Sequence, residues 1–280
     1  MIIVTGADGQ LGSDVCYQLS KLNLNYIGID KKELDITDKA AVMRFFEENK
    51  ADSLIHCAAY VAVDKAEDEK EICFAVNEKG TQNLAEACKL HSIKMLYIST
   101  DYVFNGEGEE PFEVNDAKGP LSVYGESKLR GEYAVISSIN NYFIVRTSWV
   151  FGEKNTNFIA TMLRLADTKN ELRVVCDQIG SPTYSKDLAR LVTEMIQTEK
   201  YGIYHATNEG YCSWYELAVK SFEAADKKIK TYPVTSEEYP TKAKRPKNSR
   251  LSKKSLTEAG FNPLPHWKDA VNRYITNITK

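Results

Sequence analysis

Short apolar runs alternate with segments of helical periodicity along the first half of the chain. The runs are almost continuously apolar, as in parallel strands covered on both faces, and they occupy residues 1–6, 25–30, 52–59, 94–100 and 141–151. Between them, apolar residues at helical spacing predict helices near residues 10–22, 38–49, 71–91 and 125–138. Asp38 is a candidate N-cap for the second helix. This rhythm predicts a doubly wound parallel α/β sheet.

After about residue 152 the pattern is less regular. Residues 172–192 combine a short strand, a turn with glycine and proline, and a helix that begins near Ser185. Residues 201–210 predict another short strand, and Ser213 is a candidate N-cap for the helix that follows it. The polar, proline-containing segment 231–250 is expected to be a loop, and residues 266–278 predict a closing amphipathic helix.

Composition and charge mainly exclude classes of protein, such as membrane-spanning and nucleic-acid-binding proteins. The 280 residues are 43% hydrophobic and 27% charged, which predicts a packed core in one large domain or a domain with a smaller appendage. No apolar run reaches the roughly 18 residues of a membrane span, and no secretory signal is expected from the N-terminal pattern. The net charge of −3 gives no overall attraction to nucleic acid or anionic membrane.

The cysteines and histidines do not form a metal-binding pattern. The six cysteines include no CxxC pair, and most lie in apolar segments, so we expect reduced, buried thiols in a cytoplasmic protein. The four histidines are too scattered along the chain to complete a zinc site. We therefore expect no metal.

Three glycines follow the first predicted strand at a spacing that suits phosphate binding. Gly6, Gly9 and Gly12 lie in the stretch VTGADGQLG. Glycine there allows a sharp turn and a close approach of a pyrophosphate to the backbone, while the next helix offers free N–H groups. Tight turns often produce the same triplet, so the spacing alone is a weak signal.

The end of the second predicted strand carries an acid that suits a dinucleotide site. Asp30 can accept hydrogen bonds from an adenosine ribose and would repel a 2′-phosphate, which favours NADH. Lys31 and Lys32 follow directly and could accept that phosphate, so NADPH use stays open. Asp35 and Ile36 lie where adenine could be flanked, although a turn explains Asp35 almost equally well.

A tyrosine and a lysine one helical turn apart point to proton transfer. Tyr124 and Lys128 share one helical face, while Ser99 and Thr100 end the fourth predicted strand, where open α/β sheets bind ligands. Tyrosine has an unperturbed pKa of about 10, and a nearby ammonium would lower it. Thr100 could hold a carbonyl oxygen beside Tyr124 while hydride reaches the carbonyl carbon. An ordinary exposed i,i+4 pair is the alternative.

Stretches that extend from residue 5 to about residue 252 match one enzyme family in combination. They are TGADGQLG, CAAYVAVDKAE, STDYVFNGEG, PLSVYGESKLRGE, RTSWVFG, DQIGSPTY and RPKNSRLS. The sequence therefore resembles the extended short-chain dehydrogenase/reductases, and within them the dTDP-4-dehydrorhamnose reductases. The resemblance implies a Rossmann-type domain over residues 1–151. A smaller α/β lobe over residues 152–280 would bind mainly the sugar nucleotide, with part of the chain returning to the first domain.

The reaction implied by this resemblance is reduction of the 4-keto group of dTDP-4-dehydro-L-rhamnose to dTDP-L-rhamnose. NADH or NADPH would supply the hydride, with NADH slightly favoured, and Thr100, Tyr124 and Lys128 would carry catalysis, with Tyr124 as proton donor. The residues implied for the cofactor are Gly6, Gly9, Gln10, Leu11, Asp30, Asp35, Ile36, Ala58, Ala59, Tyr60, Ser99, Tyr124 and Lys128. Asn77 would hold a water near the lysine, unless it is an exposed helix amide.

The dTDP-sugar would contact several segments. The implied residues are Thr100, Asp101, Tyr102, Tyr124, Trp149 and Arg245, with Val63 and Asp64 as further candidates. The Trp149 ring would pack against the deoxysugar, although a core tryptophan is an alternative. Arg245, in the basic stretch KAKRPKNSR, would reach the pyrophosphate, helped by Asn248 and Ser249. A solvated loop explains the same charges.

Other functions stay open at this point. A dehydratase of the same superfamily usually carries a glutamate where this chain has Tyr102, which counts against elimination. An epimerase or another reductase of nucleotide sugars would keep similar catalytic residues. A third alternative is a regulatory subunit that resembles that of methionine adenosyltransferase and binds a partner enzyme. We expect a monomer or homodimer, with no nucleic-acid or membrane partner.

Overall fold

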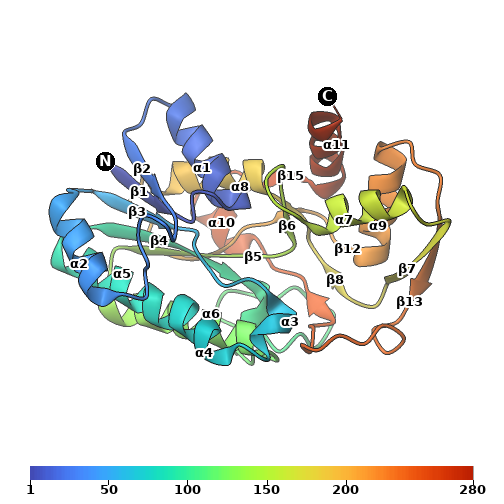
Figure 1. Ribbon diagram of the computed structural model, residues 1–280, viewed down its shortest axis with the longest axis horizontal. Helices are drawn as coiled ribbons and strands as arrows, with labels where there is room; N and C mark the ends of the chain where they lie inside the picture. Colours follow the sequence, from blue (N-terminus) through green and yellow to red (C-terminus); the bar gives the residue numbers. More distant parts are fainter. Residues whose placement is uncertain (280) are drawn as a thin grey trace.

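A parallel sheet of six strands forms the centre of the computed structural model, which describes residues 1–279 (Figure 1). Its strand order is β2-β1-β3-β4-β5-β10, with bounds Tyr26–Ile29, Ile2–Thr5, Ser53–His56, Lys94–Thr100, Tyr142–Thr147 and Gly202–His205. Every neighbouring pair is parallel. The predicted doubly wound sheet of Rossmann type is confirmed. The strand order changes direction between β1 and β3, where such sheets bind ligands at their carboxyl ends.

Helices cover both faces of this sheet. One face carries α1 (Gln10–Lys21), α8 (Ser185–Met195) and α10 (Lys254–Glu258), whose apolar residues share a core with the strands. The other face carries α2 (Lys39–Glu48), α5 (Thr81–Leu90) and α6 (Val123–Ser138). Strand β10 and helix α8 both come from beyond residue 152, so the later chain contributes to the sheet and to one covering layer.

The helix expected near 71–91 is interrupted. It consists of α4 (Lys70–Phe74), a π-helical segment (Ala75–Gly80) and α5. Gly80 lies at the end of the wide turn, where a Cβ would come within 2.7 Å of the Ile36 side chain. Such π-helical turns often mark functional positions, and this one carries the buried side chain of Asn77.

The strand expected over 141–151 is also divided. Strand β5 ends at Thr147, and β6 (Val150–Phe151) leaves the sheet to pair with β9 (Thr183–Tyr184). Trp149 lies at the break with a φ of +49°, a left-handed conformation that is uncommon for a residue with a large side chain. This bend carries the chain out of the sheet.

The later residues also build a smaller α/β lobe, seen on the right of Figure 1. Its helices α7 (Phe158–Ala166), α9 (Trp214–Ala224) and α11 (Trp267–Ile278) share one apolar core. Its strands form small sheets, which include β7 (Glu171–Val175) with β13 (Lys230–Val234), β11 (Asn208–Glu209) with β15 (Leu264–His266), and β8 (Ile179–Gly180) between β12 (Cys212–Ser213) and β14 (Asn248–Ser249). Lys280, the last residue of the predicted lobe, lies outside the described residues.

The sequence correctly predicted the N-cap residues of two helices and wrongly predicted a loop throughout one segment. Asp38 caps α2 by accepting a hydrogen bond from the Ala41 N–H at 3.0 Å, and Ser213 forms a capping box with Glu216. The expectation of a loop over 231–250 is wrong at its two ends, because β13 and β14 lie there. Pro233 fits in β13 because that strand has a single partner, β7, and an edge strand can spare an N–H.

Two further observations concern the whole described chain. Within residues 1–279, no helix combines the length and apolarity that crossing a bilayer requires. All six cysteines are free. The expectation that they are buried holds for Cys73, Cys88 and Cys212 and is wrong for Cys16, Cys57 and Cys176, which are partly exposed.

Candidate active site

The turn between β1 and α1 requires glycine. Gly6 has a φ of +69°, and a Cβ on Gly12 would lie 2.0 Å from the Gly6 carbonyl oxygen. Gly9 precedes the helix and gives it no side-chain cap, so the first N–H groups have no side-chain acceptor there. Gln10 and Leu11 begin α1, and Leu11 is buried in the core. The turn therefore forms a cradle that fits a dinucleotide pyrophosphate.

The acid at the end of β2 faces this cradle. Asp30 accepts hydrogen bonds from the N–H of Asp8, in the glycine turn, at 3.1 Å and from the N–H of Lys31 at 2.7 Å. Asp35 is a turn residue, because the hydroxyl and N–H of Thr37 donate to its carboxylate and hold its pKa below the usual value. Ile36 is 7% exposed and packs in the core beside α5.

The segment after β3 is held against the π-helical turn. The N–H of Tyr60 donates to the Asn77 side chain at 2.8 Å, and the Asn77 amide donates to the Tyr60 carbonyl at 3.0 Å. The same amide donates to the Ser127 hydroxyl of α6 at 2.9 Å. Asn77 is 1% exposed, so the alternative of a surface amide is wrong. Its contacts fix the backbone that follows Ala58 and Ala59, while water binding by Asn77 stays a prediction.

The carboxyl end of β4 brings Thr100, Asp101 and Tyr102 next to Tyr124. The Thr100 hydroxyl donates to Asp101 Oδ1 at 3.0 Å and accepts from the Tyr102 N–H at 3.2 Å. The rings of Tyr102 and Tyr124 meet edge to face with centroids 5.5 Å apart. The structure thus assembles these four predicted residues from β4, the 3₁₀ turn that follows it and α6.

The electrostatics of the tyrosine and lysine differ from the expectation. Burial raises the pKa of Tyr124 above its ordinary value, and the Thr100 hydroxyl acts in the opposite direction. Lys128 is 2% exposed, and burial lowers its pKa to about 7. Its ammonium donates to the Ile98 carbonyl at 2.8 Å and lies 4.1 Å from the centre of the Tyr97 ring. In this structure the predicted lowering of the Tyr124 pKa is therefore wrong in direction.

Sequence reasoning missed a buried ion pair behind the site. Glu132 and Arg146 are each 1% exposed, and two hydrogen bonds of 2.8 and 2.7 Å join them. The Ser99 hydroxyl donates to Glu132 at 2.5 Å, so its expected cofactor contact stays a prediction. A signal was present in the sequence, since Arg146 interrupts an otherwise apolar strand. The pair joins α6 to β5 directly behind the end of β4.

The basic segment before β14 reaches across to the first half of the chain. Arg245 pairs with Asp64 of α3 (Val63–Ala66) at 2.7 Å, and the N–H of Ala243 donates to the same carboxylate at 3.0 Å. Burial raises the pKa of Tyr102 to about 12, and the nearby positive charge of Arg245 acts in the opposite direction. Arg245 is thus part of the cluster around Tyr102, and a fully solvated loop does not describe it.

Trp149 belongs to an aromatic group at the junction with the lobe. Its ring stacks on Trp214 of α9 with centroids 3.7 Å apart. A Cβ on Gly180 would lie 2.9 Å from the Trp149 ring, so that glycine admits the indole against β8. Trp149 is partly buried at the bend between β5 and β6, and its contact with a sugar stays a prediction.

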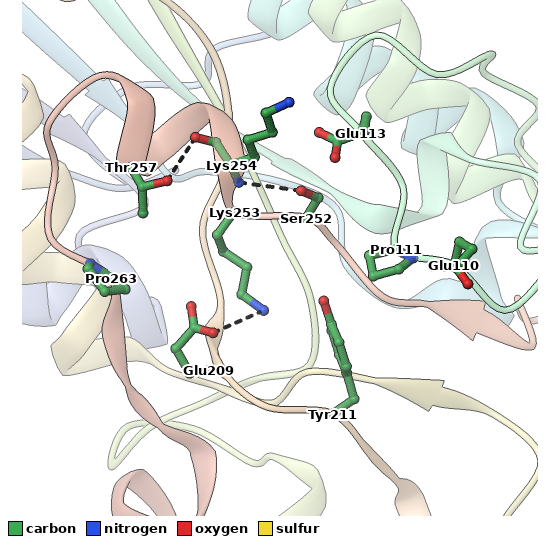
Figure 2. A pocket seen from close by; sticks show the side chains of 10 residues that line it. All are labelled: Glu110, Pro111, Glu113, Glu209, Tyr211, Ser252, Lys253, Lys254, Thr257 and Pro263. Carbon is green, nitrogen blue, oxygen red and sulfur yellow. Dashed lines mark hydrogen bonds and ion pairs between the residues drawn. The ribbon is translucent and has the colours of Figure 1, made fainter.

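A separate hollow lies away from these residues. Figure 2 shows this cavity of about 620 Å³, lined by Glu110, Pro111, Glu113, Glu209, Tyr211, Ser252, Lys253, Lys254, Thr257 and Pro263. The Lys253 ammonium lies 4.0 Å from Glu209 and over the Tyr211 ring. None of the predicted site residues lines this hollow, so it is distinct from the candidate active site. Within residues 1–279, no group of three or more histidine, cysteine or acidic side chains is arranged to hold a metal ion.

Comparison with known proteins decides the family. A family model described as the RmlD substrate binding domain matches residues 1–280. The chain belongs to this family. Among its relatives, the spore coat polysaccharide biosynthesis protein SpsK of Bacillus subtilis (strain 168) is 41% identical over 274 residues, which cover 98% of this chain and 96% of that protein.

Two solved structures extend the comparison. A dTDP-4-dehydrorhamnose reductase from Clostridium acetobutylicum ATCC 824 is 42% identical with a TM-score of 0.98, covering 100% of this chain and 99% of that chain. A dTDP-4-dehydrorhamnose reductase from Bacillus anthracis str. Ames, in complex with NADP, is 42% identical with a TM-score of 0.96, covering 99% and 98%. The resemblance to dTDP-4-dehydrorhamnose reductases is confirmed.

Proposed function

We propose that the protein is an NAD(P)H-dependent reductase that converts dTDP-4-dehydro-L-rhamnose to dTDP-L-rhamnose. The observation that carries this proposal is the grouping of Thr100, Tyr102 and Tyr124 at the carboxyl end of β4, with Lys128 buried one turn further along α6. The full-length similarity to reductases named for this substrate supports the same reaction.

The proposed chemistry needs one proton at the keto oxygen. Bound NAD(P)H supplies the hydride to the carbonyl carbon. Tyr124 would donate the proton as negative charge develops on the oxygen, and the Thr100 hydroxyl would hold that oxygen in place. Lys128 would supply positive charge that favours the resulting phenolate. Because burial raises the pKa of Tyr124, this positive charge is needed for the tyrosine to work near neutral pH.

The proposed cofactor site combines two features. The first is the glycine turn after β1, where a Cβ on Gly12 would take up the space that a pyrophosphate needs. The second is Asp30, which accepts a hydrogen bond from the N–H of Asp8 in the same turn. The carboxylate favours NADH, while Lys31 and Lys32 would tolerate the extra phosphate of NADPH. The Bacillus anthracis relative was crystallised with NADP, which supports use of NADPH as well.

The proposed substrate site spans both parts of the chain. Residues 1–151 would hold the cofactor, and residues 152–280 would supply mainly the sugar-nucleotide contacts. Arg245 forms an ion pair with Asp64 and lies near Tyr102. It would bind the pyrophosphate through paired hydrogen bonds. The aromatic face of Trp149 would exclude water beside the deoxysugar. We propose a monomer or homodimer in the cytoplasm, without nucleic-acid or membrane partners.

A stoichiometric assay tests this function. The purified protein is mixed with dTDP-4-dehydro-L-rhamnose and either NADPH or NADH, and absorbance at the nicotinamide band is followed while the sugar products are separated. We expect one dinucleotide oxidised for each dTDP-L-rhamnose formed. Sugar conversion without net oxidation would indicate an epimerase or dehydratase. No conversion, together with copurification of a methionine adenosyltransferase, would indicate a regulatory subunit.

A further inference from the structure

Asp101 is a buried acid whose two oxygens have different surroundings. The residue is 3% exposed at the end of β4. Its Oδ1 accepts the Thr100 hydroxyl at 3.0 Å. Within residues 1–279, Oδ2 has no hydrogen bond of regular geometry, and the Ser249 hydroxyl is the polar group beside the carboxyl that could reach it. A buried carboxylate oxygen without a partner is unfavourable. A donor from a ligand, or a proton on Oδ2 itself, would remove this cost where Ser249 does not reach the oxygen.

We propose that Asp101 acts as a neutral carboxylic acid whose Oδ2–H donates a hydrogen bond to an oxygen of the bound sugar. This proposal rests on the function proposed above and adds a specific role for this residue. Because Oδ1 already accepts a hydrogen bond, the proton belongs on Oδ2, and the side chain then becomes a donor. The keto and ring oxygens of a 4-keto sugar are acceptors of the matching kind.

The charges around Asp101 favour the neutral form. The titratable side chains that face it are Tyr124 of α6 and Tyr102 of its own turn. The nearby guanidinium of Arg245 contacts Tyr102 but pairs with Asp64. Burial raises the pKa of Asp101 to about 6, while the hydroxyls of Ser249 and Thr100 oppose that rise. No cation therefore pairs with Asp101 among the residues that the structure describes.

Ligand binding would complete the protonation. A bound sugar excludes water from the pocket, and loss of water disfavours the charged carboxylate further. Above a pH of about 6, where Asp101 is mostly ionised before binding, formation of the complex would therefore take up a proton. The proton comes from the solvent and remains on Oδ2. Lys128, whose pKa is about 7, is the other group of the site that titrates in this range, so the contribution of Asp101 is the part of the proton uptake that Asp101→Asn removes.

Calorimetry can count this proton. The purified protein, saturated with NADPH, is titrated with dTDP-L-rhamnose at pH 7.5 in phosphate and in Tris buffer, which differ in ionisation enthalpy. Both ligands are in the reduced state, so no turnover disturbs the heat. The wild type should take up about one proton per site. Asp101→Asn should bind with almost no proton uptake, because its amide donates without titrating.

Controls separate this role from a purely structural one. Asp14 of α1 is another carboxyl whose pKa burial raises, and it contacts Ser185 outside the proposed site. Asp14→Asn should show the same proton uptake as the wild type. In activity assays, kcat/KM of the wild type should begin to fall as pH rises above about 6. In Asp101→Asn the fall should begin only near pH 7, where Lys128 loses its proton.

The outcomes distinguish this proposal from the proposed function. Reduction of the sugar with no proton uptake by the wild type would show that Asp101 binds as a carboxylate, which overturns only the present inference. Failure of the wild type to bind the product and to reduce the keto sugar would overturn both. If Asp101→Asn does not fold, the wild-type titration in the two buffers still decides the question.

Discussion

Replacing Glu132 with glutamine should test how the buried ion pair supports the site. Glu132 and Arg146 are each 1% exposed and share two hydrogen bonds. Glutamine preserves the shape of the side chain but leaves the guanidinium buried without a countercharge. Breaking one partner of such a pair costs about 3–5 kcal/mol, a large part of the roughly 5–15 kcal/mol that stabilises a typical domain.

The same substitution should also act on Lys128, one turn earlier on α6. Burial lowers the pKa of that lysine to about 7, and the charge of Glu132 opposes this lowering. Without the carboxylate, the pKa of Lys128 should fall further, so the ammonium would be lost at a lower pH. If turnover requires the protonated lysine, the alkaline limb of the kcat profile should move to lower pH in Glu132→Gln.

Urea denaturation of four proteins measures the stability effect. They are the wild type, Glu132→Gln, Arg146→Met and the double variant, and the double variant should recover part of the loss because no unpaired charge remains. Glu126→Gln is the matched control on the same helix, since its partner Arg130 is half exposed and such pairs contribute about 0–1 kcal/mol. A Glu132→Gln protein as stable as this control would refute the reasoning.

Further substitutions test the other parts of the site. Tyr124→Phe should lower kcat by about 10²–10⁴-fold while NADPH binding, measured by fluorescence titration, is unchanged; undiminished turnover would exclude Tyr124 as proton donor. Gly12→Ala should weaken NADPH binding and destabilise the fold by about 1–3 kcal/mol, because its Cβ would lie 2.0 Å from the Gly6 oxygen; a wild-type thermal midpoint and affinity would contradict this. Lys128 has a folded pKa of about 7, below the ordinary value of about 10.4, so the unfolded state binds more protons between these values and stability should rise with pH there. Urea denaturation across that window should show less of this rise in Lys128→Met, and an equal rise would count against a buried, titrating Lys128.

The central sheet could be predicted from the sequence because its strands are continuous apolar runs. Local rules also located the caps Asp38 and Ser213, since a capping side chain acts within a few residues of its own position. The candidate residues Thr100 and Tyr124 were predicted to meet because strand ends and the following helix lie on one edge of such a sheet. These features depend on short-range patterns or on a topology with few alternatives.

The features that were missed depend on contacts between distant segments. The π-helical turn at 75–80 accompanies the contacts of Asn77 with Tyr60 and Ser127, and helical periodicity contains no sign of it. The sequence pattern places Trp149 inside a strand, whereas in the structure its left-handed φ ends the strand. Arg146 stands out in its strand, but nothing in the local sequence identifies Glu132 as its partner.

Two buried polar atoms that lack hydrogen-bond partners in the described chain indicate where a ligand could bind. Asp101 Oδ2 and Arg245 Nε lack hydrogen-bond partners within residues 1–279, and each such atom costs about 1–3 kcal/mol. Their charges are opposite and both side chains act on Tyr102, yet Arg245 pairs with Asp64 and Asp101 accepts from Thr100. A chain optimised for stability alone would pair such groups fully, and departures of this kind are expected at functional sites. If the chain binds the proposed sugar nucleotide, binding should therefore depend on the contact between the end of β4 and the segment before β14, and neither part of the chain should bind it alone.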